Sequence, residues 1–372
     1  MKLLKVKASN FKNCVDDFEI DFIAKSKKTI EDKEYELQEI ADGLFVFNTM
    51  AFVGKNASGK TTAVELLNCC YSILESFSYE PDNNFLDNVK LEIYFYHDGF
   101  IFKYLTNITS KDALSNKVTF SEQKLFSKTY YKSYANEVYS DNGFVEYDKI
   151  YTLPEDTSIV FFPLEKKQVK CIYFSCDEMG KRTYDSVFKY LKTFKINESV
   201  LQSIIDIFDN NINSLSKLET DTYSLVYQNS ERILSSNDLY HTLSSGTTKG
   251  MLLYIGVIIS LKYGIDLIVD EIENHFHKSL VENILNLYKD KNVNKKNATL
   301  IFTTHYCEIL DSFNRQDNIW ISKCDKKVSL ENMYIHYNER SDLLKSKKFY
   351  NNTFKTAVNY EALMKLKKEL MI

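Results

Sequence analysis

Apolar and polar residues alternate along the first third of the chain in the manner of β-strands. Two such runs lie within residues 3–22, and a polar loop at 24–34 separates them from further apolar runs within 44–53. Residues 89–105 alternate on both sides of the turn His97-Asp98-Gly99, which predicts a β-hairpin. The chain therefore opens with a β-layer.

Later in the chain the pattern changes to helices and buried strands. Apolar residues recur at helical spacing over 184–208. Further on, the pattern predicts a helix at 250–263, a strand at 267–269, a helix at 280–288, a strand at 299–303 and a closing helix at 360–371. Because strands that alternate with helices pair in parallel, we expect a parallel sheet here.

These elements predict an α/β fold with a mixed sheet, an antiparallel β-layer and an inserted α-rich subdomain. We expect residues 1–127 to form the first part of the core, 128–239 the α-rich insertion, and 240–372 the second part of the core. The low number of glycines and prolines, 10 and 3, argues against long flexible linkers.

Composition limits the possible functions. The 372 residues are 44% hydrophobic and carry a net charge of -4, so no global positive charge marks the chain as a nucleic-acid binder. The 7 cysteines are scattered without paired metal-ligand spacing, so we expect reduced thiols, no transition metal and a cytoplasmic protein. The longest apolar stretch, 251–261, is too short to span a bilayer, and we expect no membrane contact.

A glycine-containing loop carries the first chemical signal. The sequence Gly54-Lys55-Asn56-Ala57-Ser58-Gly59-Lys60-Thr61 follows an apolar strand and precedes a helical segment, which is the setting of a phosphate-binding loop. Its glycines let backbone N–H groups converge on phosphate oxygens, Lys60 adds charge for the outer phosphates, and the Thr61 hydroxyl suits Mg²⁺. We expect ATP and Mg²⁺ as ligands, with binding residues Gly54, Asn56, Ser58, Gly59, Lys60, Thr61 and Thr62.

Two carboxylates follow a buried strand in the second half. Asp270 and Glu271 end the run 265–269, at the carboxyl edge of the predicted parallel sheet where nucleotides bind. Asp270 would hold Mg²⁺ through water. Glu271 would orient or deprotonate the attacking water, because phosphoryl transfer depends on positioning and on neutralising charge.

The order of the motifs extends this reading. Leu243-Ser244-Ser245-Gly246-Thr247 precedes the helix at 250–263, so a serine hydroxyl and backbone N–H groups of this segment lie at a helix N-terminus and form an anion site. His305 follows the strand at 299–303. A phosphate loop, Leu-Ser-Ser-Gly-Thr, an Asp-Glu strand end and then a histidine resembles ATP-binding-cassette heads. The resemblance implies that Ser244 and Gly246 reach the γ-phosphate of a second subunit in trans, and that His305 is a catalytic switch that contacts the γ-phosphate.

Four short motifs restrict the resemblance to a smaller group of ATPases. They are Asn10-Phe11-Lys12, Asp270-Glu271-Ile272-Glu273-Asn274 followed by His277, Thr303-Thr304-His305 and Asp317-Asn318-Ile319-Trp320. These are similar to the AAA_15/AAA_21-type ATPases, relatives of RloA and of the overcoming-lysogenization-defect (OLD) nucleases, close to RecF and SMC heads. Thr353, Thr356, Asn359 and Lys278 depart from that family's usual glycines and prolines.

This resemblance implies a homodimer or higher homo-oligomer that forms on ATP and regulates a separate effector in anti-phage defence. The effector would be a nuclease, possibly of TOPRIM type, because we expect no room for such a domain in this chain. Two alternatives stay open: a RecF/SMC-like DNA-repair ATPase that clamps DNA itself, and an ATP-binding scaffold with low turnover.

Weaker signals have two interpretations each. His275 and His277 could bracket a metal with Asp270, but their position favours a dimer contact. Cations and aromatics interleave over 124–134, as in single-strand binders, although a solvated sheet edge is the simpler reading. Gln123 and Gln168 are the candidates for the glutamine of the family's Q-loop.

Overall fold

The computed structural model describes residues 1–81, 86–111, 117–147, 153–175, 183–274, 276–337, 344–351, 353–354 and 360–370. The chain divides into two compact units. The first combines Met1–Lys167 with Thr303–Ile372, and the second is Gln168–Phe302. The division therefore falls inside strand β15 (Leu300–Thr304). The three parts 1–127, 128–239 and 240–372 remain a prediction.

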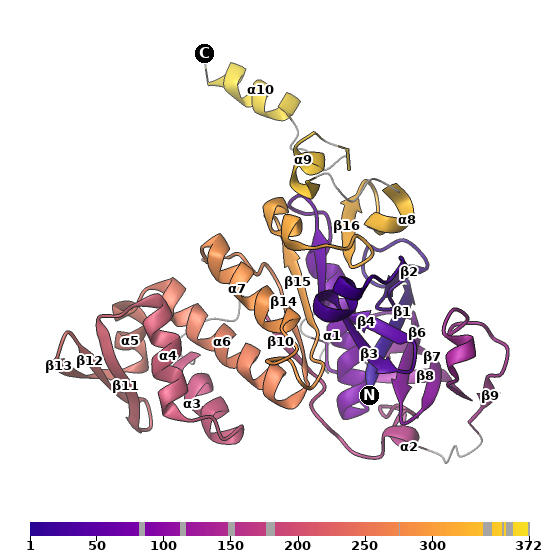
Figure 1. Cartoon of the computed structure of the whole chain (residues 1–372), viewed down its shortest axis with the longest axis horizontal. Coiled ribbons are helices and arrows are strands. Elements are labelled where there is room, and N and C mark those ends of the chain that lie inside the picture. Colours follow the sequence, from indigo (N-terminus) through magenta and orange to yellow (C-terminus); the bar gives the residue numbers. More distant parts are fainter. Residues whose placement is uncertain are drawn as a thin grey trace. The chain divides into compact units, whose positions relative to one another are not determined.

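The first unit contains the expected antiparallel β-layer, a sheet of order β2-β1-β6-β7-β8-β9 (Figure 1). Its strands are β1 (Lys2–Ser9), β2 (Phe18–Asp21), β6 (Val89–His97), β7 (Phe100–Ser110), β8 (Val118–Thr129) and β9 (Val145–Glu146). The predicted hairpin is β6–β7, and its two turn residues have positive φ, 46° at Asp98 and 84° at Gly99. This conformation matches the twist of the strands that it joins.

A second group of strands in the first unit positions the phosphate loop. Strand β5 (Thr49–Val53) pairs in parallel with β16 (Ile319–Cys324), which pairs in antiparallel fashion with β17 (Val328–Asn332). Helix α1 (Lys60–Ser76) follows the loop and buries most of its length in the core. β3 (Leu37–Ala41) and β4 (Leu44–Phe47) form a separate two-stranded sheet.

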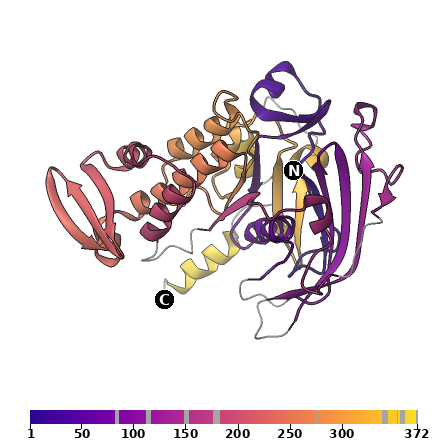
Figure 2. The same cartoon turned by 90° about the horizontal axis from the view of Figure 1, so that it is seen from below.

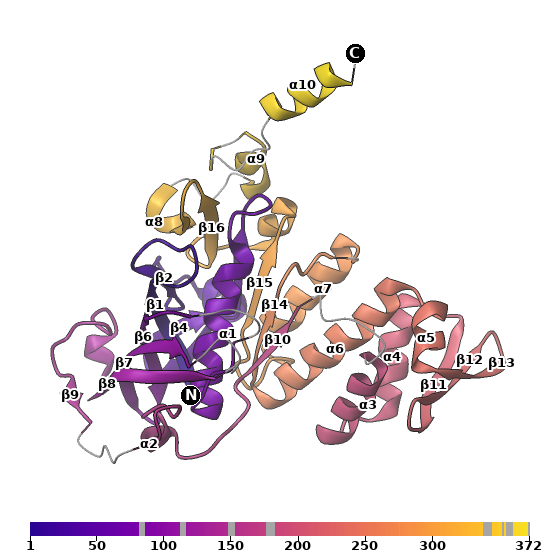
Figure 3. The same ribbon diagram turned by 180° about the vertical axis from the view of Figure 1, so that it is seen from behind.

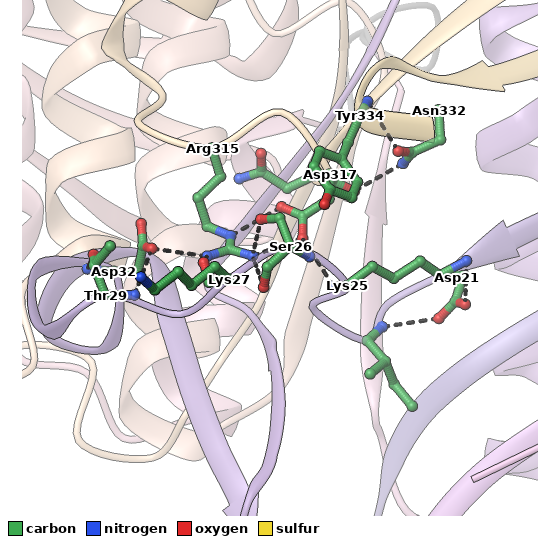
Figure 4. Close-up of polar contacts among 12 residues, drawn as sticks. Asp21, Lys25, Ser26, Lys27, Thr29, Asp32, Arg315, Asp317, Asn332 and Tyr334 are labelled. Carbon is green, nitrogen blue, oxygen red and sulfur yellow. Dashed lines mark hydrogen bonds and ion pairs between the residues drawn. The ribbon is translucent and has the colours of Figure 1, made fainter. Parts of the chain in front are cut away.

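The polar loop at 24–34 is held by a buried arginine (Figure 4). Arg315 bonds both carboxylate oxygens of Asp317 at 2.9 and 2.6 Å and pairs with Asp32 at 2.9 Å. It also donates to Ser26 and to the carbonyl of Lys27. The loop ends in a π-helical turn, η1 (Asp32–Glu36). We name Arg315 and its four partners, Ser26, Lys27, Asp32 and Asp317, the arginine cage.

Short helices complete the first unit (Figure 3). They are η2 (Lys132–Tyr134), α2 (Phe161–Leu164), η4 (Cys307–Ser312), α8 (Met333–Tyr337), α9 (Lys345–Tyr350) and α10 (Tyr360–Glu369). The last of these confirms the predicted closing helix.

The second unit contains further parallel strands. β10 (Cys171–Phe174), β14 (Asp266–Val269) and β15 pair in parallel, as the alternation of strands and helices predicts. The two predicted helices are α6 (Ser245–Tyr263) and α7 (Lys278–Lys289).

The remainder of the second unit holds the helices expected of the insertion and, in addition, a sheet that was not expected. The stretch 128–239 was expected to be α-rich, and it does contain α3 (Thr183–Thr193), α4 (Glu198–Phe208) and α5 (Ser236–Thr242). It also contains an antiparallel sheet of β11 (Ile212–Glu219), β12 (Thr222–Tyr227) and β13 (Ser230–Ser235) (Figure 2). Its turns place Asp221, Gln228 and Asn229 at positive φ without any glycine, so the usual hairpin signal is missing from the sequence.

Two further observations concern the described residues alone. None of their helices is both long and apolar enough to cross a membrane. Nor do they include a group of three or more His, Cys, Asp or Glu side chains arranged to hold a metal ion.

Candidate nucleotide site

The phosphate loop forms a tight cradle between β5 and α1. Ala57 has φ 59°, and Gly59, which caps α1, has φ 95°. A Cβ atom added to Gly59 would lie 2.3 Å from Cγ1 of Val328, and one added to Gly54 would lie 2.5 Å from the carbonyl oxygen of Ser322. Both positions therefore require glycine, because any side chain would collide with β16 or β17.

Strand β16 also holds the middle of the loop. The Ser322 hydroxyl, which is fully buried, donates to the carbonyl of Ser58 at 2.7 Å. The Ser58 hydroxyl is itself buried and has no hydrogen-bond partner among the described residues. A buried hydroxyl without a partner is costly, and a phosphate oxygen would satisfy it. We name the two strands β16 and β17, which carry Ser322 and Val328, the bracing hairpin.

Lys60 and His305 meet at this loop. Lys60 is 5% exposed, and its ammonium donates to the carbonyls of Gly54 and Lys55, both at 3.1 Å. The same nitrogen lies 3.2 Å from Nδ1 of His305. Since an ammonium can only donate, Nδ1 of the half-buried His305 is the acceptor in this contact, which leaves Nε2 to face another group. The predicted switch histidine is thus brought to the predicted phosphate lysine.

The start of α1 suits an anion. The helix carries no acidic residue in its first turn, so its backbone N–H groups and its dipole face the loop without a competing charge. Asn56 and Thr61 are exposed and Thr62 is half-buried. The glycine cradle, the buried lysine and this helix terminus fit a triphosphate, and the Thr61 hydroxyl fits a hydrated Mg²⁺.

In the second unit, Asp270 and Glu271 stand directly after β14. Asp270 is 8% exposed, and its amide donates to the carbonyl of Phe174 at 2.9 Å. Glu271 is half-buried and has φ 53°. A left-handed conformation costs a residue other than glycine about 1–2 kcal/mol and gathers at functional sites. The turn thus presents a carboxylate at the end of a parallel strand.

The Leu-Ser-Ser-Gly-Thr segment lies at the start of α6. The Ser244 hydroxyl accepts from the amide of Thr247 at 3.0 Å, so Ser244 is the helix cap that its sequence indicates. Ser244 is exposed and Gly246 is half-exposed, and the first turn of α6 contains no acidic residue. This terminus can therefore receive an anion from outside the unit.

The weaker candidates have structural explanations. Gln123 accepts hydrogen bonds from Tyr104 and from the amide of Ile159, at 2.6 and 3.0 Å, so its amide oxygen is engaged within the first unit. Gln168 begins the second unit. His277 caps α7 through Ser279, whereas His275 lies outside the described residues.

Lysine side chains in the segment 124–134 also form ion pairs and hydrogen bonds within the chain. Lys132 pairs with Asp42 at 2.9 Å, and Lys128 donates to the carbonyls of Glu137 and Ser140. Tyr131 and Tyr134 are exposed and pack edge to face. These contacts suit a solvated sheet edge.

The sequence did not identify the residues that support the site from other elements. Ser322 and Val328 contact the loop from the bracing hairpin. Lys12, in the loop after β1, pairs with Glu65 in the second turn of α1. Ser322 and Val328 lie outside the quoted motifs, and Lys12 belongs to the Asn10-Phe11-Lys12 motif, which by itself does not indicate a contact with Glu65.

Known structures give distant likenesses. The SMC head domain from Thermotoga maritima shows 12% identity and a TM-score of 0.39, with 89% of this chain and 99% of that chain covered. The SMC head bound to the C-winged helix domain of ScpA shows 11% identity and a TM-score of 0.46, covering 90% and 98%. The cbiO1 protein from Clostridium perfringens, part of the ABC transporter complex cbiONQ, shows 12% identity and a TM-score of 0.32, covering 86% and 93%.

Sequence comparison is more decisive. No protein with a curated description matches the chain. The model of the AAA_21 family, described as "AAA domain, putative AbiEii toxin, Type IV TA system", matches residues 50–311. This range contains the phosphate loop, the Leu-Ser-Ser-Gly-Thr segment, the Asp-Glu pair and His305, and it spans more than two thirds of the sequence. The chain therefore belongs to the AAA_21 family of P-loop ATPases.

Proposed function

We propose that this protein binds ATP with Mg²⁺ and hydrolyses the bond to the γ-phosphate. The observation that carries the proposal is the contact between Lys60 and His305 at the mouth of the glycine cradle. Lys60 already points its charge at the loop, and His305 stands where a γ-phosphate held by that lysine would reach it. When bound, Mg²⁺ neutralises charge on the β- and γ-phosphates.

The residues of the chain then have distinct roles. The loop amides and Lys60 hold the phosphates, and Thr61 and Asp270 hold the ion, Asp270 through water. Glu271 accepts a proton from the attacking water, or orients that water in line with the leaving oxygen. His305 donates from its ring to the γ-phosphate. Catalysis on this model consists of positioning and charge neutralisation.

We further propose that two copies complete each other's sites. The exposure of Ser244 and the acid-free first turn of α6 support a role in trans, because an anion can approach this terminus from outside. A homodimer formed on ATP would place Ser244 and Gly246 of one copy on the γ-phosphate bound by the other.

The biological role that we propose is control of a separate effector, such as a nuclease, in anti-phage defence. The family's description, which names a toxin of a Type IV TA system, supports a role in defence. The rival is a DNA-repair ATPase that clamps DNA itself. A steep decrease in DNA affinity with rising salt, measured without any partner, would favour the rival.

Nucleotide binding and turnover test the proposal. Lys60→Ala should abolish ATP binding, because the phosphates lose their buried cation. Lys55→Ala is the matched control, since Lys55 lies in the same loop with an exposed side chain. Glu271→Gln should keep ATP binding and lose single-turnover hydrolysis. Unchanged turnover in the Lys60 or Glu271 variant would contradict the assigned roles, and a wild type that binds ATP without turnover would favour the scaffold.

The trans arrangement needs a separate test. With ATP, Glu271→Gln should sediment as a dimer, and adding Ser244→Arg should return it to a monomer that still binds ATP. Ser214→Arg, on an exposed position of β11, is the control for added charge. A Ser244→Arg protein with full activity would remove the trans site from the proposal.

A further inference from the structure

The described residues of the segment 345–354 contact η4, which follows His305, and α8, which in turn contacts the bracing hairpin. This segment comprises α9 and the turn after it, and we name it the C-terminal strap. At one end it contacts η4, which begins two residues after His305. At the other end it reaches the bracing hairpin by way of α8. The phosphate loop, the Leu-Ser-Ser-Gly-Thr segment, the Asp-Glu pair and His305 all lie outside this segment, which belongs to the part of the tail that departs from the family's pattern at Thr353.

Hydrogen bonds fasten the strap to η4. The amide and the hydroxyl of Ser346 donate to the two carboxylate oxygens of Asp311, at 3.0 and 2.5 Å. The ammonium of Lys345, only 4% exposed, donates to the carbonyl of Phe313 at 2.6 Å. Tyr350 bonds to Glu308. The strap therefore holds η4 near its beginning, near its end and just beyond it.

η4 in turn is tightly joined to the histidine. Thr304, on the other side of His305, is fully buried, and its hydroxyl accepts from the amide of Tyr306 at 3.0 Å. Ile309 and Leu310 are also fully buried. Because Thr304 before His305 and η4 two residues after it are anchored in the core, a displacement of the His305 backbone is passed on to η4 through Tyr306.

The far end of the strap packs toward the bracing hairpin. The ring of Phe354, which is fully buried, lies 4.5 Å from the ring of Phe349 and 4.7 Å from that of Tyr337. The Tyr337 hydroxyl accepts from Lys323 at 2.6 Å and bonds to Glu331. Lys323 directly follows Ser322, the residue that holds the phosphate loop.

A helix as short as α9 is not stable by itself in water. Its order therefore depends on η4 and on α8, and a shift in either of them changes the strap. We propose that the C-terminal strap senses the γ-phosphate: when His305 moves from Lys60 to the nucleotide, η4 moves with it and the strap becomes more ordered. This inference rests on the proposed function, and the same contacts would hold His305 in position for turnover.

Ser346 is then a positioning residue, and its effect should fall on turnover and not on binding. Ser346→Ala removes the hydroxyl bond to Asp311, which should lower kcat roughly three- to tenfold while ATP affinity stays within about twofold. Ser346→Thr keeps a hydroxyl and should restore kcat. An unchanged kcat in Ser346→Ala, or an equal loss in both variants at equal melting temperatures, would overturn the positioning role.

Hydrogen exchange tests the sensing directly. A non-hydrolysable ATP analogue should slow amide exchange at 345–354 in the wild type. In His305→Ala, which keeps Lys60, the analogue should slow exchange in the phosphate loop but not in the strap. If the analogue slows amide exchange in the wild-type phosphate loop but leaves exchange in the strap unchanged, this inference alone is overturned. A loop that the analogue leaves unprotected would overturn the proposed function and this inference together.

Discussion

Gly59→Ala is the sharpest test of the phosphate cradle, because the structure predicts two separable penalties. The first is conformational. Gly59 has φ 95°, where alanine costs about 1–2 kcal/mol. If only the native loop binds ATP, this strain alone should weaken affinity roughly 5- to 30-fold.

The second penalty is steric and depends on Val328. The new methyl group would lie 2.3 and 2.7 Å from the two Cγ atoms of Val328, so the loop or β17 has to shift. The single variant should therefore lose more than about 30-fold in ATP affinity. Adding Val328→Ala removes the steric part, and the double variant should recover to the roughly 5- to 30-fold loss of strain alone.

Calorimetric titration with a non-hydrolysable ATP analogue would measure these affinities, with melting temperatures to confirm folding. Val328→Ala alone is the control, since it leaves glycine in the loop and should bind nearly as well as wild type. Wild-type affinity in Gly59→Ala would refute the cradle geometry. A double variant no better than Gly59→Ala would show that Val328 does not close the cradle.

Two further predictions concern stability and thiol chemistry. Arg315→Met should lower the free energy of unfolding in urea by about 3–5 kcal/mol, because it leaves the buried carboxylates of Asp32 and Asp317 without their cation. Adding Asp317→Asn should restore part of the lost stability. A loss under about 1 kcal/mol in Arg315→Met would contradict the prediction. Burial raises the pKa of the Cys14 thiol to about 12, so at pH 8 only about one molecule in ten thousand carries the reactive thiolate. Iodoacetamide mass mapping should find the half-exposed Cys324 labelled well before Cys14, and equal rates would contradict the burial of Cys14.

Features that depend on neighbouring residues could be predicted from the sequence. The phosphate loop was recognisable because its glycines, its lysine and the flanking strand and helix are contiguous. The β6–β7 hairpin followed from Asp98 and Gly99, two residues that tolerate positive φ. The sheet of β11–β13 was not predicted, because the turn between β12 and β13 uses Gln228 and Asn229 at positive φ, and this pair lacks the glycine that marks a hairpin turn.

Features that depend on strand order could not be predicted. Ser322 and Val328 support the phosphate loop only because β16 lies beside β5 and β17 beside β16. Nothing near either residue in the sequence indicates this neighbour relation. The contact between Lys60 and His305 falls between the two cases, because the order of the motifs predicted that both serve one phosphate.

The arginine cage has a consequence for how the sequence can drift. Every nitrogen of the Arg315 guanidinium already has an acceptor, and two of those acceptors are carboxylates shielded from water. Replacing one residue of the cage would leave a buried charge without its counter-ion or a buried N–H group without an acceptor. Among descendants of this gene, positions 32, 315 and 317 should therefore covary, changing in concert or keeping their identities.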